Sequence, residues 1–296
     1  MLRYSCSLTH KLRRFKRKNN RRNYKLITDS SANPAIMAQG VATVPLRVRL
    51  GNHEYVDDAK LDTAAMLEDL REYKGKSGSA CPGVQDWLDA FGDADEVFAA
   101  TISSGVSGCY NAAAIAANTY MADNSGKKAY VLDSLTTGPE LHLLMEKYQE
   151  LLNEGLPFED ICRGVREYSK HTHLLFSLES LDNLAKNGRC SPVLAKAAGI
   201  LGIRVVGKAS DEGTLEAMHK CRGEKSALVQ LYATMKELGF CGGKVRITHT
   251  YNPRAAVRLM ALIHEEFPSC KVEISHNGGL CAFYTETGGL LVGFEG

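Results

Sequence analysis

Short β-prone runs of mostly apolar residues alternate with longer helical stretches along the first half of the chain. The period of the apolar positions, together with β-branched residues, distinguishes the two kinds of segment. Strands are predicted at residues 24–31, 42–50, 95–104 and 128–134, and helices at residues 62–73, 83–91, 108–122 and 138–155. Such alternation predicts a parallel α/β sheet.

A second α/β region follows a change of pattern near residue 165. Its predicted helices cover residues 178–186, 223–239 and 252–267, and its predicted strands cover residues 202–209, 244–250, 271–276 and 280–284. We therefore predict an N-terminal parallel α/β domain at residues 25–165 and a C-terminal α/β domain at residues 166–296.

Polar residues follow three of the first-half strands, at positions 29–31, 103–104 and 133–134. Ligands in open α/β sheets sit outside the carboxyl ends of the strands, so these segments predict one binding site. Asp and Ser are also good helix N-caps, and this is the role that we favour for Asp133 and Ser134.

The six residues Ser-Ser-Gly-Val-Ser-Gly at positions 103–108 form the predicted turn between a strand and a helix. Free backbone N–H groups, the helix dipole and the serine hydroxyls all favour an anion there. A phosphate site would normally carry G-x-G-x-x-G, or Lys-Ser or Lys-Thr after the turn, and this turn has neither. Neutral donors of this kind suit a carboxylate.

A serine-dependent lipid or ester hydrolase is the alternative for this turn. The chain has no G-x-S-x-G motif, and no His is tied by spacing to Ser103, Ser104 or Ser107. Triad partners are often distant in sequence, so the alternative stays open.

The charge of the chain is uneven. The net charge is +2, yet residues 1–25 hold ten Lys or Arg and no acidic residue, which leaves the rest mildly acidic. We interpret residues 1–24 as an unstructured basic extension, in preference to a membrane-surface tag or a nucleic-acid arm at residues 11–22. No apolar segment follows the basic run as a secretory signal requires, and no run of eighteen apolar residues predicts a membrane span.

The nine cysteines are an odd number and include no C-x-x-C pair. This argues against a disulfide framework and a structural zinc site, and it favours a reducing cytosol. His171 and His173 share one face of a predicted strand without a third ligand nearby, so we predict no metal. The expected location is cytoplasmic.

A series of short motifs runs along the chain in order. ITDSSA covers residues 27–32, SACPGVQDWLDAF covers 79–91, TISSGVSGCYNAA covers 101–113, LDNLAKNGRCS covers 181–191, and GILGIRVVGKASDEGTL covers 199–215, with Arg222 after them. Together they resemble the DegV family of bacterial fatty-acid-binding proteins, over about residues 25–294. The second motif corresponds to the family's Thr-Ser-Gln-Pro-Ser-Pro segment, and the third to Ser-Ser-x-x-Ser-Gly-Thr-Tyr, with Cys109 in place of Thr.

The resemblance implies a two-domain α/β protein with a ligand cleft between the domains and a long-chain fatty acid buried in it. Such proteins are not enzymes and have no cofactor; they present the acid to a separate fatty acid kinase, which makes acyl phosphate. Ser79 takes the place of the family's headgroup-binding Thr, and Ser103 or Ser104, next to Gly105, takes that of its headgroup-binding Ser. We expect a monomer.

This chain differs from the family pattern at one headgroup position, and the resemblance also suggests two docking residues. Glu286 stands where the family often has a headgroup-binding His, and a carboxylate there would repel the ligand unless one of the two is protonated. His276 could substitute for that His in space, or lie on the surface. Arg189 and Arg222 are candidates for docking to the kinase, with solvated loop charge as the alternative.

Overall fold

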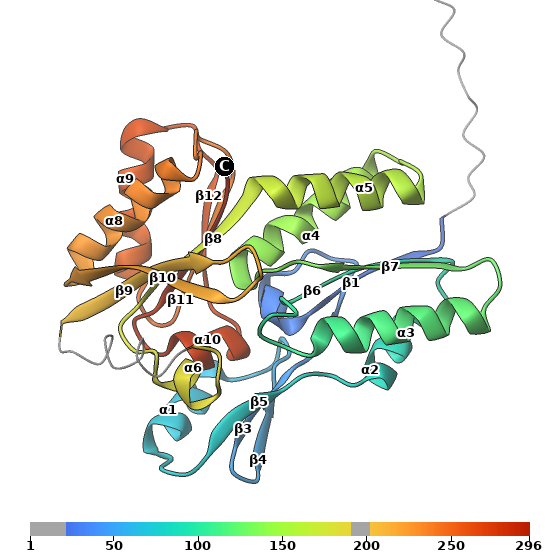
Figure 1. Ribbon diagram of the computed structural model, residues 1–296, viewed down its shortest axis with the longest axis horizontal. Helices are drawn as coiled ribbons and strands as arrows, with labels where there is room; N and C mark the ends of the chain where they lie inside the picture. The colour runs from blue at the N-terminus through green and yellow to red at the C-terminus, as the bar shows by residue number, and fades with distance from the viewer. Residues whose placement is uncertain (1–21, 191–201) are drawn as a thin grey trace, which may run out of the picture.

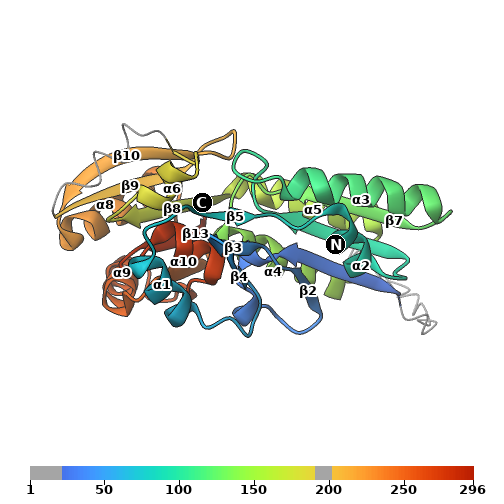
Figure 2. The same cartoon turned by 90° about the horizontal axis from the view of Figure 1, so that it is seen from below.

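The computed structural model describes residues 22–190 and 202–296, and these residues form three β-sheets (Figure 1). The predicted basic extension falls mainly on residues 1–21, which lie outside the described residues. Viewed from below, the first large sheet and the second lie at opposite ends of an elongated molecule (Figure 2).

The first sheet is parallel throughout, as the sequence pattern predicted. Its strands run in the order β2-β1-β6-β7, with bounds Val41–Val44, Tyr24–Asp29, Glu96–Thr101 and Lys128–Asp133. Successive side chains of a strand point to opposite faces. Val97 and Ala99 of β6 therefore join one hydrophobic core, while Phe98 and Ala100 join another.

Helices cover both faces of this sheet, as the connections between parallel strands require. Helices α2 (Val84–Phe91) and α3 (Cys109–Asp123) pack on one face, and α4 (Gly138–Asn153) and α5 (Phe158–Tyr168) pack on the other (Figure 1).

A small antiparallel sheet has the order β4-β3-β5, with bounds His53–Val56, Arg47–Leu50 and Ser77–Ala80. The single strand predicted at residues 42–50 is thus split between two sheets. Pro45 stands at the break, where it cannot donate to a strand ladder. Helix α1 (Thr63–Glu72) packs beside this sheet through Met66.

The second large sheet is mixed. It runs in the order β10-β9-β8-β13-β11-β12, with bounds Leu215–Arg222, Ile203–Ala209, Thr172–Leu178, Leu290–Glu295, Val245–His249 and Val272–His276. Only β11 and β12 pair in parallel among its described strands. Helices α8 (Glu224–Glu237) and α9 (Pro253–Glu266) cover one face of the sheet. The other face is turned toward the rest of the molecule.

The strand predicted at residues 280–284 is wrong. The structure places helix α10 (Gly279–Thr285) there, next to the short helix α6 (Asp182–Lys186). The carboxylate of Asp57 accepts hydrogen bonds from the N–H groups of Gly279 and Leu280, at 2.7 and 3.1 Å. A helix N-terminus gains from an acidic partner, and this one lies 222 residues away from Gly279, so no local pattern could predict it.

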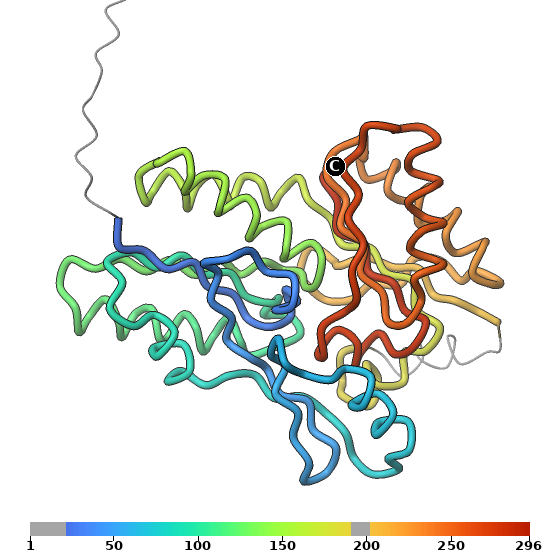
Figure 3. The backbone as a smooth tube through the Cα atoms, turned by 180° about the vertical axis from the view of Figure 1, so that it is seen from behind, coloured from blue at the N-terminus to red at the C-terminus, as the bar shows by residue number. Residues whose placement is uncertain are grey.

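Helix α4 packs against both large sheets. Its first turn crosses β13 so closely that a Cβ atom on Gly293 would lie 2.4 Å from the backbone nitrogen of Glu140. Farther along α4, Glu146 pairs with Arg246 of β11 through two hydrogen bonds of 2.8 and 2.9 Å. From behind, the N-terminal end of α4 lies beside the orange-red strands of the second sheet (Figure 3). The helix therefore joins the two halves.

Glu140 gives this junction a pH dependence. Its side chain is buried, it accepts a hydrogen bond of 2.8 Å from the Thr172 hydroxyl, and burial raises its pKa to about 7 from 4.5. The folded protein therefore holds a proton that the unfolded chain releases between these two values, so this group lowers stability as pH rises from about 4.5 to 7. Glu140→Gln should remove about 3 kcal/mol of that fall.

Chemical unfolding at pH 5 and pH 8 measures this effect. The exposed Glu265→Gln is the matched control and should keep the wild-type pH dependence. An unchanged pH slope in Glu140→Gln would contradict the assignment.

Candidate binding cavity

A cavity of about 290 Å³ lies between the uncovered face of the second large sheet and the carboxyl end of the first. Its walls come from both halves of the chain. Strands β8, β9, β10 and β13 and helix α10 contribute from the second half, and β5 and the loops after β6 and β7 contribute from the first. The volume is near the lower end of the range for small-molecule sites.

The wall on the side of the second sheet is apolar. The two-residue period of β8 turns Leu174, Phe176 and Leu178 toward the cavity, while Leu175 faces α8 and α9. Further apolar lining comes from Leu184, Leu215, Leu280 and Leu291.

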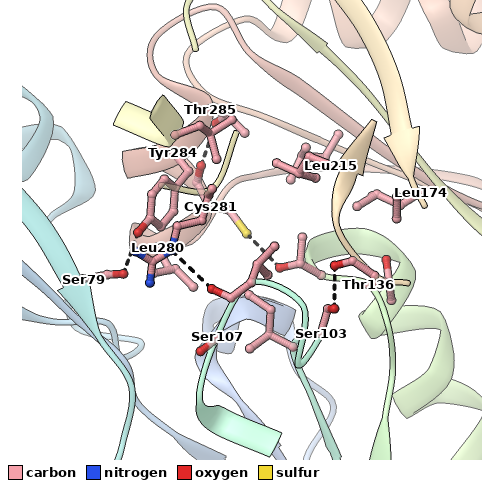
Figure 4. Close-up of a pocket in the computed structure, with 18 of the residues that line it drawn as sticks. Ser79, Ser103, Ser107, Thr136, Leu174, Leu215, Leu280, Cys281, Tyr284 and Thr285 are labelled. Carbon is pink, nitrogen blue, oxygen red and sulfur yellow. Dashed lines mark hydrogen bonds between the residues drawn. The ribbon is translucent and has the colours of Figure 1, made fainter. Parts of the chain in front are cut away.

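Polar groups gather on another side of the cavity. The hydroxyls of Ser79 and Tyr284 lie 2.7 Å apart and are hydrogen-bonded. Figure 4 shows this pair on the side of the cavity opposite Leu174 and Leu215. The guanidinium of Arg189 also lines the cavity and donates from its Nε to the Val106 carbonyl at 3.3 Å. The cavity thus has an apolar part and a part with hydroxyls and a positive charge.

The predicted strand-to-helix turn forms part of the wall. The Ser103 hydroxyl donates to the Gly213 carbonyl at 2.6 Å and accepts from the Gly105 N–H at 3.0 Å. Ser107 also lines the cavity. Ser104 and Gly105 are exposed and are not among the lining residues, and the Ser104 N–H donates to Asp133 at 3.0 Å.

The other two polar strand ends support the wall without lining it. Asp29 is buried and accepts hydrogen bonds from the N–H groups of Ile102 and Ser31, at 2.6 and 3.0 Å, and burial raises its pKa. Asp133 accepts hydrogen bonds from backbone N–H groups of its own loop and of the neighbouring loop. The N-cap of α4 is Thr137, so the predicted N-cap role of Asp133 and Ser134 is wrong.

Glu286 points away from the cavity. Its carboxylate accepts hydrogen bonds from the Ser180 hydroxyl at 2.8 Å and the Asn183 N–H at 3.2 Å, at the start of α6. Burial raises its pKa, although these two hydrogen bonds oppose the shift. Glu286 is therefore not one of the residues that line the cavity.

His276 also lies away from the cavity. It is exposed at the end of β12, with its ring 4.5 Å from that of His249. Arg222 is exposed at the end of β10 and is outside the cavity lining, in contrast to Arg189.

Sequence reasoning missed several lining residues. Tyr284 was predicted to lie in a strand. Thr136 and Thr137 lie in the loop after β7, just beyond Asp133 and Ser134. The polar strand end at Asp133 was a signal for this loop, but nothing local indicated Tyr284.

Two features are absent from residues 22–190 and 202–296. Within these ranges, no three His, Cys, Asp or Glu side chains gather as a metal-ligand set. No helix in residues 22–190 or 202–296 combines the length and apolar character needed to cross a membrane.

Comparison with known proteins gives one family. The DegV family model matches residues 23–295. A DegV domain-containing protein of Streptococcus pneumoniae is 40% identical over 278 residues, which are 92% of this chain and 99% of the relative.

Two solved structures are similar over the same share of the chain. A DegV family protein from Eubacterium eligens loaded with heptadecanoic acid is 42% identical with a TM-score of 0.89, covering 92% of this chain and 99% of that chain. The Streptococcus pneumoniae Fatty Acid Kinase (Fak) B3 protein loaded with linoleic acid is 38% identical with a TM-score of 0.90 and the same coverage. The chain described here therefore belongs to the DegV family.

Proposed function

We propose that this protein binds one long-chain fatty acid in the cavity and catalyses no reaction on it. The observation that carries the proposal is the division of the cavity into an apolar part along β8 and a polar part at Ser79, Tyr284 and Arg189. An acyl chain gains about 0.8 kcal/mol for each buried CH₂, so the tail supplies most of the affinity. The fatty acids in the Eubacterium eligens and Streptococcus pneumoniae structures support this ligand class.

The carboxylate would lie at the polar part. The hydroxyls of Ser79 and Tyr284 and the guanidinium of Arg189 match a carboxylate, and hydrogen bonds to charged groups are the stronger ones. The Ser103 hydroxyl also lines the cavity, although it donates its proton to the Gly213 carbonyl. This assignment leaves Ser104, Gly105, Glu286 and His276 outside the headgroup site.

A hydrolase is the weaker alternative. It needs a base beside one of the serines, and no histidine within the described ranges lines the cavity. The Ser107 hydroxyl donates to the Cys109 sulfur at 3.3 Å, which is no base for catalysis.

Native mass spectrometry of the purified protein, followed by solvent extraction, tests the function. We expect a released fatty acid, and its mass gives the chain length and saturation. A protein that is empty and takes up no added fatty acid would contradict the proposal. Release of an alcohol and an acid from an added ester would favour the hydrolase.

Ser79→Ala should weaken fatty-acid binding modestly, by roughly threefold to tenfold, because one hydrogen bond contributes about 1 kcal/mol. A fluorescent fatty-acid displacement assay measures the change. Ser104→Ala, at an exposed serine of the turn after β6 that does not line the cavity, is the matched control and should bind as the wild type does. Equal loss in both variants would contradict the assigned headgroup site.

We also propose that the protein presents its fatty acid to a fatty acid kinase, because a similar solved structure is a Fatty Acid Kinase B3 protein. Arg222 is exposed and suits docking, whereas Arg189 is placed to contact the ligand. The cytoplasmic location and the monomeric state stay predictions.

Arg222→Ala should raise the apparent KM of the kinase for the loaded protein several-fold, since rim charges act mainly on encounter, and leave fatty-acid affinity unchanged. Lys220→Ala, exposed two positions earlier on the same strand, is the control for general charge. An equal rise in apparent KM in Arg222→Ala and Lys220→Ala would exclude a specific docking role for Arg222.

A further inference from the structure

Two cysteines lie close together in the structure, one at the edge of the cavity and one buried behind it. Cys81 follows β5 directly and is exposed, whereas Cys109 is the first residue of α3 and is buried. The turn before α3 comes close to Cys81, because a Cβ atom on Gly108 would lie 3.2 Å from the Cys81 sulfur. Cys81 itself lines the cavity, so its sulfur lies where the cavity wall meets the solvent, with the buried Cys109 behind it.

The surroundings of Cys81 stabilise its thiolate. A hydrogen bond from the Cys109 thiol is the main cause that lowers the pKa of Cys81 to about 6. The N–H groups of Cys81 and Gly108 and the charge of Arg189 lower this pKa further, against the effect of partial burial. The thiolate is the nucleophilic form of cysteine, so Cys81 is the reactive member of the pair.

Cys109 has the opposite character in the reduced protein. Its hydrogen bond to Cys81, its burial and the nearby Asp29 all raise its pKa. The first of these causes disappears once the sulfur of Cys81 is oxidised and loses its negative charge. Cys109 then becomes a better attacking group, and the turn residue just before it, Gly108, lies against the Cys81 sulfur.

From this arrangement we propose that Cys81 and Cys109 are a redox-active pair, which a hydroperoxide such as H₂O₂ converts into a disulfide at the edge of the cavity. The Cys81 thiolate attacks one peroxide oxygen, the O–O bond breaks, and the second oxygen leaves as hydroxide and takes up a proton to form water. Cys81 is then a sulfenic acid. The Cys109 sulfur loses its proton and bonds to the Cys81 sulfur, while the S–O bond breaks and releases a second water. The two thiols lose two electrons, and the peroxide gains them.

The disulfide would join two segments that carry hydroxyls of the cavity. Ser79 precedes Cys81 by two residues, and Ser107 precedes Cys109 by two residues. A disulfide holds its Cβ atoms about 3.5–4.5 Å apart, so oxidation fixes the spacing of these two segments. The consequence for a bound carboxylate rests on the proposed function, whereas formation of the disulfide does not.

One tryptic peptide tests the disulfide without any ligand. Residues 77–127 contain no Lys or Arg before Lys127, and Cys81 and Cys109 are their only cysteines. After the full-length protein is treated with a small excess of H₂O₂ and the remaining thiols are alkylated, we expect this peptide to lose two hydrogen atoms and carry no alkyl group. Cleavage at Asp93 should then leave the two halves linked until a reductant is added.

Matched thiols and variants make the test specific. Cys241 is exposed elsewhere in the same molecule and should react with peroxide at least about tenfold more slowly than Cys81. Cys109→Thr introduces the residue of the corresponding family segment and should stop Cys81 at a sulfenic acid that dimedone captures. Cys81→Ser should leave Cys109 reduced.

Other results would overturn the proposal. Uptake of two or three oxygen atoms by the wild-type peptide without a link, or a Cys81 that reacts no faster than Cys241, excludes a redox-active pair. If the protein binds fatty acid but forms no disulfide, the redox-active pair is excluded while the proposed fatty-acid binding stands. A disulfide that forms without changing fatty-acid affinity removes only the consequence for the ligand.

Discussion

Ala209→Trp is expected to abolish binding of long-chain fatty acids while the protein stays folded. Ala209 is the last residue of β9 and lines the cavity beside Leu215, with which it pairs across the strands. An indole at this position occupies space that several methylene groups would fill. Exclusion of about four CH₂ groups costs about 3 kcal/mol, which raises the Kd by at least about 100-fold.

The chain-length profile measures this effect most directly. Ala209→Trp should lose affinity for sixteen- and eighteen-carbon acids far more than for ten-carbon acids. Val229→Trp, on the exposed face of α8 with 52% of its surface accessible in the wild type, is the matched control for adding an indole. Unchanged binding of long acids by a folded Ala209→Trp protein would show that the acyl chain lies elsewhere.

Asp57→Ala is expected to lower the free energy of unfolding by about 3 kcal/mol, because it leaves two buried N–H groups of α10 without a partner. The carboxyl is buried, and burial raises its pKa to about 6 even though hydrogen bonds from Ser30, Leu280 and Gly279 oppose the shift. At pH 8 the group is ionised and accepts both helix N–H groups. The loss should therefore be measured at that pH, by urea unfolding.

Two further variants separate the causes. Asp58→Ala removes an exposed carboxylate that binds only its own turn, and it should change stability by less than about 0.5 kcal/mol. Asp57→Asn keeps one acceptor and should fall between the two. Because α10 carries Tyr284, Asp57→Ala should also weaken fatty-acid binding at a temperature where the protein is folded. A loss in Asp57→Ala no larger than in Asp58→Ala would contradict this account.

Local patterns along the chain predicted most of the N-terminal sheet. The apolar run before Ser103 and the alanine-rich helix after it are visible in sequence, and both exist in the structure. The break at Pro45 was missed because two strands of different sheets follow each other with only two residues between them. Apolar alternation alone does not reveal such a change of sheet.

The cavity was predictable only where its residues belong to short motifs that can be recognised in the sequence. Ser79 and Ser103 were identified because short motifs surround them, and both line the cavity. Tyr284 was not, since its helix depends on Asp57, a partner far away in sequence. Glu286 shows the same limit, because the contacts that turn its carboxylate away come from Ser180 and Asn183.

Helix α4 has a consequence for how the molecule comes apart. A chain cut near residue 165 would leave the second sheet without the helix that crosses β13 at Gly293 and pairs with Arg246. Each half would then expose to water the surface that it buries against the other half. The two halves should therefore unfold together in a single calorimetric transition. A molecule occupying the cavity would accordingly raise the melting temperature of the entire chain.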